Sequence, residues 1–169
     1  MLKKNVTSFN TDIFKVFDKY WAIVTAGDKN VGYNAMTVSW GGLGTLWNKP
    51  VAFIFVRKSR YTHEFLDKSD SVTISFMSEK YKSAMTLFGR KSGRDLDKFK
   101  ETNLHPSFEP DFNGYFVAEA EQVLKCKKIM STDIDVDKLP DYLKEEQYST
   151  NDIHTMYVLE VKQYLTNEE

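Results

Sequence analysis

Apolar and small polar side chains alternate with a period of two along residues 34–40 and 71–76. Two other segments, residues 21–26 and 51–56, are almost entirely apolar on both faces. Alternation is typical of a strand with one buried face, and a short apolar run between turn residues is typical of a buried strand. We therefore predict a strand over each of the four segments.

Further elements follow from the same patterns in the rest of the chain. They are a glycine loop at residues 41–44, a short helix ending near 68, a helix at 79–88, a polar turn-rich loop at 89–97, strands at 115–130 and 155–165, and an acidic surface loop with a helical turn at 133–148. The sum is about six strands, often consecutive in the chain, and two or three short helices. Consecutive strands without a helix between each pair favour an antiparallel barrel over a doubly wound parallel sheet.

Composition narrows the class of protein. The chain of 169 residues fits a single domain spanning residues 1–169, and 41% hydrophobic with 28% charged residues is an ordinary globular balance. The net charge of −1 argues against a nucleic-acid partner. The longest apolar run, residues 51–56, is too short to span a membrane, and no signal-peptide pattern opens the sequence. We expect a cytoplasmic protein with neither nucleic acid nor membrane as a partner.

Several common catalytic motifs are absent from the sequence. It has no P-loop, no HExxH, no paired CxxC and no GxSxG motif, and its three histidines are far apart. Residues 42–47 begin like a dinucleotide fingerprint, but no helical pattern follows them. We therefore expect no metal site.

Cys126 is the only cysteine, so no intramolecular disulfide can form. One interpretation is a redox thiol beside a cofactor, which neighbouring lysines would activate if the thiol were exposed. The other is a small residue packed on a strand. We favour packing, because no second cysteine exists to form an internal dithiol.

The strongest local signal for binding is residues 57–62 (RKSRYT), between a predicted buried strand and a predicted helix start. The first N–H groups of a helix lack internal partners and suit a phosphate, and arginine and hydroxyl side chains add donors. The alternative is a capped helix whose basic residues are simply solvated.

A second signal is residues 34–44. Small and hydroxyl side chains occupy one face of the predicted strand, and the glycines after it would let a flat ring approach the backbone. Trp40 and Trp47 would flank such a ring; the alternative is an edge strand with core tryptophans. A third, weaker signal is residues 91–98, which otherwise form a solvated loop before a short helix.

Three segments occur in order: NAMTVSWGGLGTLWNKP at 34–50, VRKSRYTHEFLDKSDSVTISF at 56–76 and FGRKSGRDLDKFKET at 88–102. Together they resemble the flavin reductase-like family with the FMN-binding split barrel, particularly its flavoredoxin-like branch. The similarity covers about residues 21–165, and residues 152–157 resemble the family's last strand. The resemblance implies a mainly β fold, an antiparallel Greek-key split β-barrel with a few short flanking helices. It also implies a homodimer with FMN near the dimer interface.

The resemblance also implies roles for the candidate segments. Residues 34–40 would line the isoalloxazine ring, residues 57–62 would hold the phosphate, and backbone N–H groups of residues 37–41 would hydrogen-bond the ring. No catalytic acid or base is named, because hydride transfer to flavin does not require one. The predicted cofactor-binding residues are Asn34, Ala35, Met36, Thr37, Ser39, Trp40, Arg57, Ser59, Arg60, Tyr61, Thr62, Lys98 and His154.

Several functions share these features. The first is an oxidoreductase that moves electrons from NAD(P)H, or from a redox partner protein, through FMN to an acceptor. The second is a non-enzymatic electron-transfer module, and the third is a protein that stores or senses flavin. A structural interaction domain, with its aromatic residues in a dimer interface, would bind no flavin and would leave the three ordered motifs unexplained. We favour the oxidoreductase.

Overall fold

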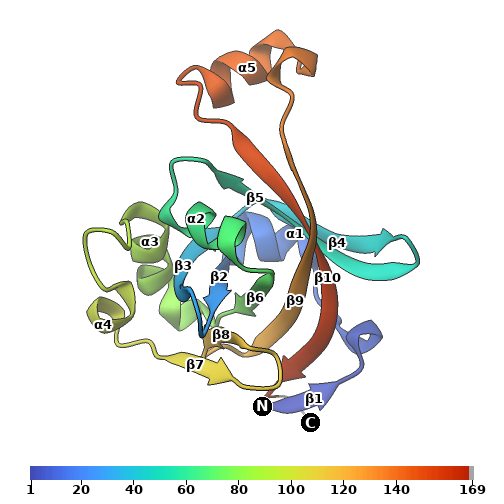
Figure 1. Ribbon diagram of the computed structural model, residues 1–169, viewed down its shortest axis with the longest axis vertical. Helices are drawn as coiled ribbons and strands as arrows, with labels where there is room; N and C mark the ends of the chain where they lie inside the picture. Colours follow the sequence, from blue (N-terminus) through green and yellow to red (C-terminus); the bar gives the residue numbers. More distant parts are fainter. Residues whose placement is uncertain (168–169) are drawn as a thin grey trace.

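The computed structural model describes residues 1–167, and strands dominate it (Figure 1). The strands are β1 (Leu2–Lys4), β2 (Ala22–Asp28), β3 (Gly32–Val38), β4 (Gly41–Leu46), β5 (Lys49–Arg57), β6 (Ser71–Phe76), β7 (Pro106–Glu109), β8 (Gly114–Val117), β9 (Gln122–Asp133) and β10 (His154–Thr166). The α-helices are α1 (Ile13–Lys15), α2 (Tyr61–Lys68), α3 (Lys82–Arg90), α4 (Lys98–Thr102) and α5 (Asp141–Tyr148). Single turns of other helix types lie at Val6–Ser8, Val16–Tyr20, Glu79–Tyr81 and Val136–Lys138.

One antiparallel sheet organises the fold. Its strand order is β3-β2-β6-β9-β10-β5-β4, with β1 added on β10, while β7 and β8 form a separate hairpin. Helices α2 and α3 pack against β3, which forms one end of the strand order. The prediction of a mainly β, antiparallel fold with a few short helices is confirmed.

Two apolar clusters fill the structure. The larger one gathers side chains from most of the sheet, including Val24, Ile54, Ile74 and Tyr157, each with no exposed surface. The smaller one lies around Phe88 of α3. Cys126 belongs to the larger cluster, where burial raises the pKa of its thiol, so the structure agrees with the packing role.

The predicted glycine loop at residues 41–44 is wrong, because this segment is strand β4. Gly41 serves close packing, whereas a Cβ on Gly42 would meet no atom within 4 Å. A Cβ on Gly41 would lie 2.7 Å from Phe17 Cε1 and 2.7 Å from the Phe53 carbonyl oxygen. The π-helical turn at Val16–Tyr20, which the sequence patterns did not predict, therefore packs directly on the strand.

Other boundaries also differ from the prediction. The single strand expected at residues 115–130 is two strands, β8 and β9, because the chain turns between them at an Ala120 N–H to Val117 carbonyl hydrogen bond. Strands β1 and β7 were missed, as was β4, which was expected to be a loop. Together with the division of one expected strand into two, this gives ten strands in residues 1–167 where about six were expected. The acidic segment contains the eight-residue helix α5 in place of a single helical turn.

The β9–β10 hairpin carries α5 away from the barrel, and the β4–β5 hairpin projects separately (Figure 1). The C-terminal end of α5 returns toward β5, where the Arg57 guanidinium lies 5.5 Å from the centre of the Tyr148 ring. None of the helices in the described part of the chain has both the length and the apolar character needed to cross a membrane.

Candidate functional site

Two adjoining cavities lie along β3. The first has a volume of about 290 Å³, and strands β3 and β5 with the end of α5 surround it. Its walls combine a ring, hydroxyl groups and two guanidinium groups, which suits a flat polar ligand. The lining residues are Met36, Thr37, Val38, Ser39, Trp40, Phe55, Arg57, Arg60, Gln147 and His154.

The second cavity has a volume of about 170 Å³ and is strongly basic. It lies between the start of α2 and the segment joining α3 to α4, and it shares Met36 and Arg60 with the first cavity. The lining residues are Asn34, Met36, Ser59, Arg60, Tyr61, Thr62, Arg90, Lys91, Ser92, Gly93, Arg94 and Lys98.

The structure brings together almost all of the residues that the sequence singled out. Every predicted cofactor-binding residue except Ala35 lines one of the two cavities. The Ala35 side chain packs in the smaller apolar cluster, and its carbonyl oxygen instead accepts a hydrogen bond from Lys98 Nζ. Residues from β3, β5, α2, α4 and β10 therefore converge on one region, whatever ligand it holds.

Lys98 and Arg60 are the two cations set deepest in this region. Lys98 is only 5% exposed, and its Nζ donates to the carbonyl oxygens of Ala35 and Phe88. Burial, with a smaller contribution from the charge of Arg60, lowers the pKa of Lys98 to about 8. Arg60 donates to the Gly89 carbonyl, and burial lowers the pKa of its guanidinium as well. Within residues 1–167 neither cation has a carboxylate within 4.0 Å, which is an arrangement suited to an anionic ligand.

The start of α2 adds further donors. In the described part of the chain no side chain caps this helix at Arg60, and the His63 N–H already donates to the Arg60 carbonyl, so the N–H groups of Tyr61 and Thr62 are the ones available to a ligand. The Thr62 hydroxyl accepts a hydrogen bond from Asn34 Nδ2 at 2.8 Å, which fixes both side chains on the cavity wall. The predicted alternative of a helix capped by its own side chain is therefore not what the structure contains.

Arg57 and Ser59 of the 57–62 segment each donate two hydrogen bonds to the segment around α5 and β10. Arg57 donates to the carbonyl oxygens of Asp152 and Gln147, at 2.5 and 3.0 Å. Ser59 donates through its N–H and hydroxyl to the Asp152 carboxylate, at 3.1 and 2.6 Å. These contacts tie the segment to the chain just before β10, so Arg60 and Thr62 are better placed than Arg57 and Ser59 to contact a phosphate directly.

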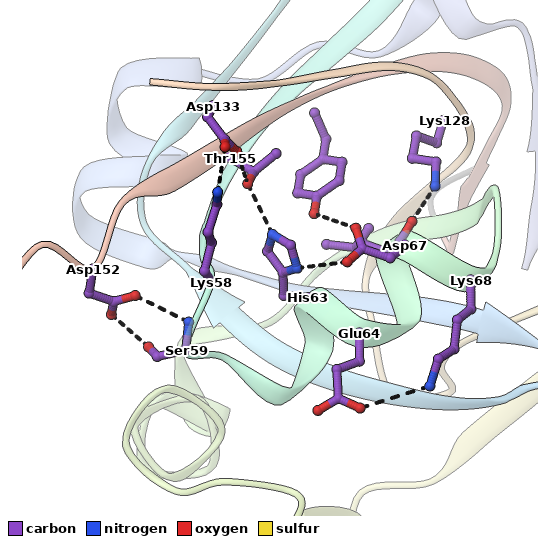
Figure 2. Close-up of polar contacts among 12 residues, drawn as sticks. Lys58, Ser59, His63, Glu64, Asp67, Lys68, Lys128, Asp133, Asp152 and Thr155 are labelled. Carbon is purple, nitrogen blue, oxygen red and sulfur yellow. Dashed lines mark hydrogen bonds and ion pairs between the residues drawn. The ribbon is translucent and has the colours of Figure 1, made fainter. Parts of the chain in front are cut away.

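A polar network holds α2 against β9 and β10 (Figure 2). Lys58 pairs with Asp133, whose carboxylate also accepts a hydrogen bond from the Thr155 hydroxyl at 2.8 Å. The His63 ring lies between the Thr155 hydroxyl, at 2.9 Å, and Asp67, at 3.1 Å. Figure 2 shows His63 at the centre of this chain of contacts, which joins α2 to β9 and β10.

β3 supplies a backbone edge to the first cavity. Among the strands of residues 1–167, β3 pairs only with β2, so its other edge has no strand partner there. The Ala35 carbonyl points to that edge, since it accepts from Lys98, and the N–H of Thr37 two residues on points the same way. The Thr37 hydroxyl is held by the Met85 carbonyl at 2.6 Å.

His154 closes the far side of the first cavity. Its ring lies 5.0 Å from the Trp40 ring, between centres, and its Nδ1 is 3.0 Å from the Tyr148 hydroxyl. Burial and then the neighbouring charge of Arg57 lower the pKa of His154 to about 4, so the imidazole is neutral near pH 7. Trp47, the second predicted ring partner, lies in the β4–β5 turn, lines neither cavity and is 58% exposed.

The cavity residues that sequence reasoning missed come mainly from two segments. Gln147 could not be found from its own pattern, because the fold of the β9–β10 hairpin brings it to the site. The basic run at 90–94 was visible in the sequence, but charged loops are usually solvated. Three of the cavity residues lie outside the three segments that the sequence singled out for binding: Phe55, Gln147 and Arg90. Val38 lies within residues 34–40, and four others belong to the weaker third segment without having been named individually: Lys91, Ser92, Gly93 and Arg94.

Comparisons with known proteins bear on this arrangement. The family model described as "Flavin reductase like domain" matches residues 16–169. This chain belongs to that family. No curated protein matched the chain by sequence.

Solved structures of similar fold support the split-barrel architecture of the family. Flavoredoxin of Desulfovibrio vulgaris (Miyazaki F) is 20% identical, with a TM-score of 0.70 over 99% of this chain and 78% of that one. An FMN-binding protein from Thermus thermophilus is 16% identical, with a TM-score of 0.67 over 98% and 80%. An NADH:FAD oxidoreductase of Streptomyces globisporus C-1027 is 18% identical, with a TM-score of 0.64 over 86% and 74%. The predicted split barrel and family are thereby confirmed, and a flavin-related redox function follows from the family.

Proposed function

We propose that this protein is an FMN-binding oxidoreductase that passes electrons from NAD(P)H or a protein donor to an acceptor. The observation that carries the proposal is the pair of deep cations, Arg60 and Lys98, which have no carboxylate partner among the described residues and adjoin a cavity built on the β3 edge. FMN combines a phosphate dianion with a flat polar ring, and the two adjoining cavities match these two parts.

The residues present fit FMN. Arg60, Lys98, Thr62 and the uncapped start of α2 would hold the phosphate. The Thr37 N–H would donate to the polar edge of the ring, and neutral His154 would contribute one further donor or acceptor. When bound, flavin supplies the transfer of electrons, as a hydride or singly, and the protein supplies binding, orientation and access.

An alternative function is a non-enzymatic FMN-binding electron-transfer or flavin-binding protein. The fold similarity to flavoredoxin is compatible with it. The exposed basic residues Arg90, Lys91 and Arg94 would in that case face an acidic donor protein. Reduction only by a protein donor, and not by a nicotinamide, would select this alternative.

The direct test is an absorbance spectrum of the purified protein after incubation with FMN and desalting. We expect the flavin bands to be retained and then bleached on anaerobic addition of NADPH or NADH. Retained but unbleached flavin supports the alternative function. A colourless protein that shows no FMN binding in an equilibrium titration would overturn both.

We also propose a homodimer. Phe14 and Trp47 are 89% and 58% exposed, and Trp40 is 45% exposed. Phe14 and Trp40 line an apolar groove of about 640 Å³ beside the first cavity. Large exposed apolar patches are typical of interfaces, and a second copy of this chain is the partner that the family resemblance implies.

Sedimentation velocity tests the dimer. We expect a mass of twice 19.6 kDa for the parent protein and a shift to the monomer mass for Phe14→Asp combined with Trp47→Asp. Val31→Asp, at an exposed apolar position in the turn between β2 and β3, is the matched control and should remain dimeric. A parent protein that sediments as a monomer at all concentrations would contradict the proposal.

A further inference from the structure

The basic cavity carries more positive charge than one flavin phosphate would balance. Five cationic side chains line it, and in the described part of the chain only Arg94 has a carboxylate within 4.0 Å, at 2.5 Å from Glu64. A phosphate monoester brings a charge of about −1.5 to −2 near neutral pH. Counting Glu64 and that phosphate, a surplus of about two positive charges remains.

Burial divides these cations into an inner and an outer set. Lys98 is buried and Arg60 is half-buried, whereas Arg90, Lys91 and Arg94 are exposed at the mouth. The proposed flavin phosphate would lie beside the inner set, because Arg60 also lines the first cavity, where the flavin ring would bind. The outer three cations are therefore left for a second anion.

The chain around Gly93 and Arg94, which carries the outer set of cations, is fixed by several contacts. Arg94 Nη1 donates to the Ser59 carbonyl at 3.2 Å, and its guanidinium lies 4.7 Å from the centre of the Tyr61 ring. Gly93 packs so closely that a Cβ there would lie 2.2 Å from Asn34 Oδ1. A cationic segment fixed against another cationic segment incurs repulsion, which a bound anion would relieve without further ordering of the chain.

The shape of the site favours a small ligand over a protein surface. The cations converge on a concave cavity that adjoins the first cavity, and Arg60 and Met36 line both. A ligand that places one end at the flavin ring and carries a phosphate at its other end would therefore place that phosphate near the outer cations Arg90, Lys91 and Arg94. Arginine presents paired donors that match phosphate geometry, which makes a phosphate the fitting anion.

We propose that Arg90, Lys91 and Arg94 form a second phosphate subsite, which binds the 2′-phosphate of NADPH and selects it over NADH. The inference rests on the proposed function, because it presumes a nicotinamide donor. In that reaction the nicotinamide C4–H bond breaks and its hydride passes to flavin N5, while the flavin takes up a proton from solvent and NADP⁺ leaves. NADPH and NADH differ only in the 2′-phosphate, so their comparison isolates the subsite.

Stopped-flow reduction of the FMN-loaded protein tests the subsite. We expect the second-order rate constant for NADPH to exceed that for NADH by about tenfold or more, as one or two charge-assisted contacts would give. The double variant Arg90→Ala/Lys91→Ala should lose most of this preference by slowing NADPH, and NADH should change by about twofold at most. Lys80→Ala/Lys100→Ala removes the same charge from exposed lysines that do not line the cavity, and should keep the preference.

A binding measurement separates this inference from the proposed function. Calorimetric titration with adenosine 2′,5′-bisphosphate and with AMP requires no turnover, and it is done with and without FMN. We expect the bisphosphate to bind about tenfold or more tightly than AMP to the parent, and equally to AMP in Arg90→Ala/Lys91→Ala.

Equal binding of the two nucleotides by the parent, or equal use of NADPH and NADH, would overturn the subsite while leaving the flavin site intact. Reduction by an acidic donor protein alone would also overturn it. Absence of FMN binding in an equilibrium titration would instead count against the proposed function, and the bisphosphate titration would still decide whether the subsite exists.

Discussion

Replacing Arg60 with alanine should weaken FMN binding by about 2–3 kcal/mol, while riboflavin binding should change by about 0.5 kcal/mol at most. Arg60 is half-buried and lines both cavities, and within the described part of the chain the Gly89 carbonyl is the only hydrogen-bond acceptor of its side chain. A charge-assisted contact to the phosphate is therefore lost when the side chain is removed. Riboflavin lacks the phosphate, so it reports on ring binding alone. Fluorescence titration of both ligands measures the difference.

Lys58→Ala is the matched control for this experiment. Lys58 belongs to the same basic segment, but it is exposed, pairs with Asp133 and lines neither cavity. We expect its FMN affinity to equal that of the parent. If Arg60→Ala binds FMN as tightly as the parent does, or loses riboflavin and FMN to the same extent, the phosphate does not lie beside Arg60.

FMN affinity should fall by roughly tenfold or more between pH 7.5 and pH 9.5. The pKa of Lys98 lies near 8, lowered by burial and then by the charge of Arg60. Lys98 is therefore charged at pH 7 and loses its charge as the pH rises past 8. The second ionisation of the FMN phosphate, with a pKa near 6, is complete below this range, so the pH dependence belongs to the protein.

The stability of the free protein should respond in the opposite direction. Between pH 8 and 10.5 the unfolded chain keeps the Lys98 proton and the folded protein releases it. The unfolded state then binds more protons, so the contribution of Lys98 to the free energy of unfolding rises with pH in this window. Urea denaturation of the flavin-free protein measures that contribution as the difference between the parent and Lys98→Met.

Lys98→Met should bind FMN weakly at pH 7.5 and show little further loss up to pH 9.5. Lys100→Met, on the same helix but exposed and outside the cavities, should keep the pH dependence of the parent. An affinity for FMN that is flat across this range in the parent would show that Lys98 does not contribute its charge to the bound phosphate.

The sequence alone determined the central strands and the segments that line the site. Residues 71–76 alternate and form β6 with those same bounds, and the apolar run at 51–56 lies within β5. These assignments succeed because the alternation of apolar and polar residues is a local property of the sequence, and it matches the alternating side-chain directions of a strand. The arginine and threonine positions in 57–62 were likewise visible, since a helix start after a buried strand is a local signal.

Only the tertiary structure decided what depends on distant contacts. The glycines at 41–44 looked like a loop, yet they form β4 because they pair with β5, with Gly41 opposite Ile54 and Gly44 opposite Val51. The β9–β10 hairpin brings Gln147 to a cavity that begins on β3, more than a hundred residues earlier in the chain. In the basic run, Arg57 donates to the Asp152 and Gln147 carbonyls and Lys58 pairs with Asp133, which leaves Arg60 to face the basic cavity. Lys98, from a helix farther along the chain, is the second deep cation there. Local patterns determine which residues have the right chemistry, but burial and pairing determine which of them retain a charge for a ligand, because both depend on the whole fold.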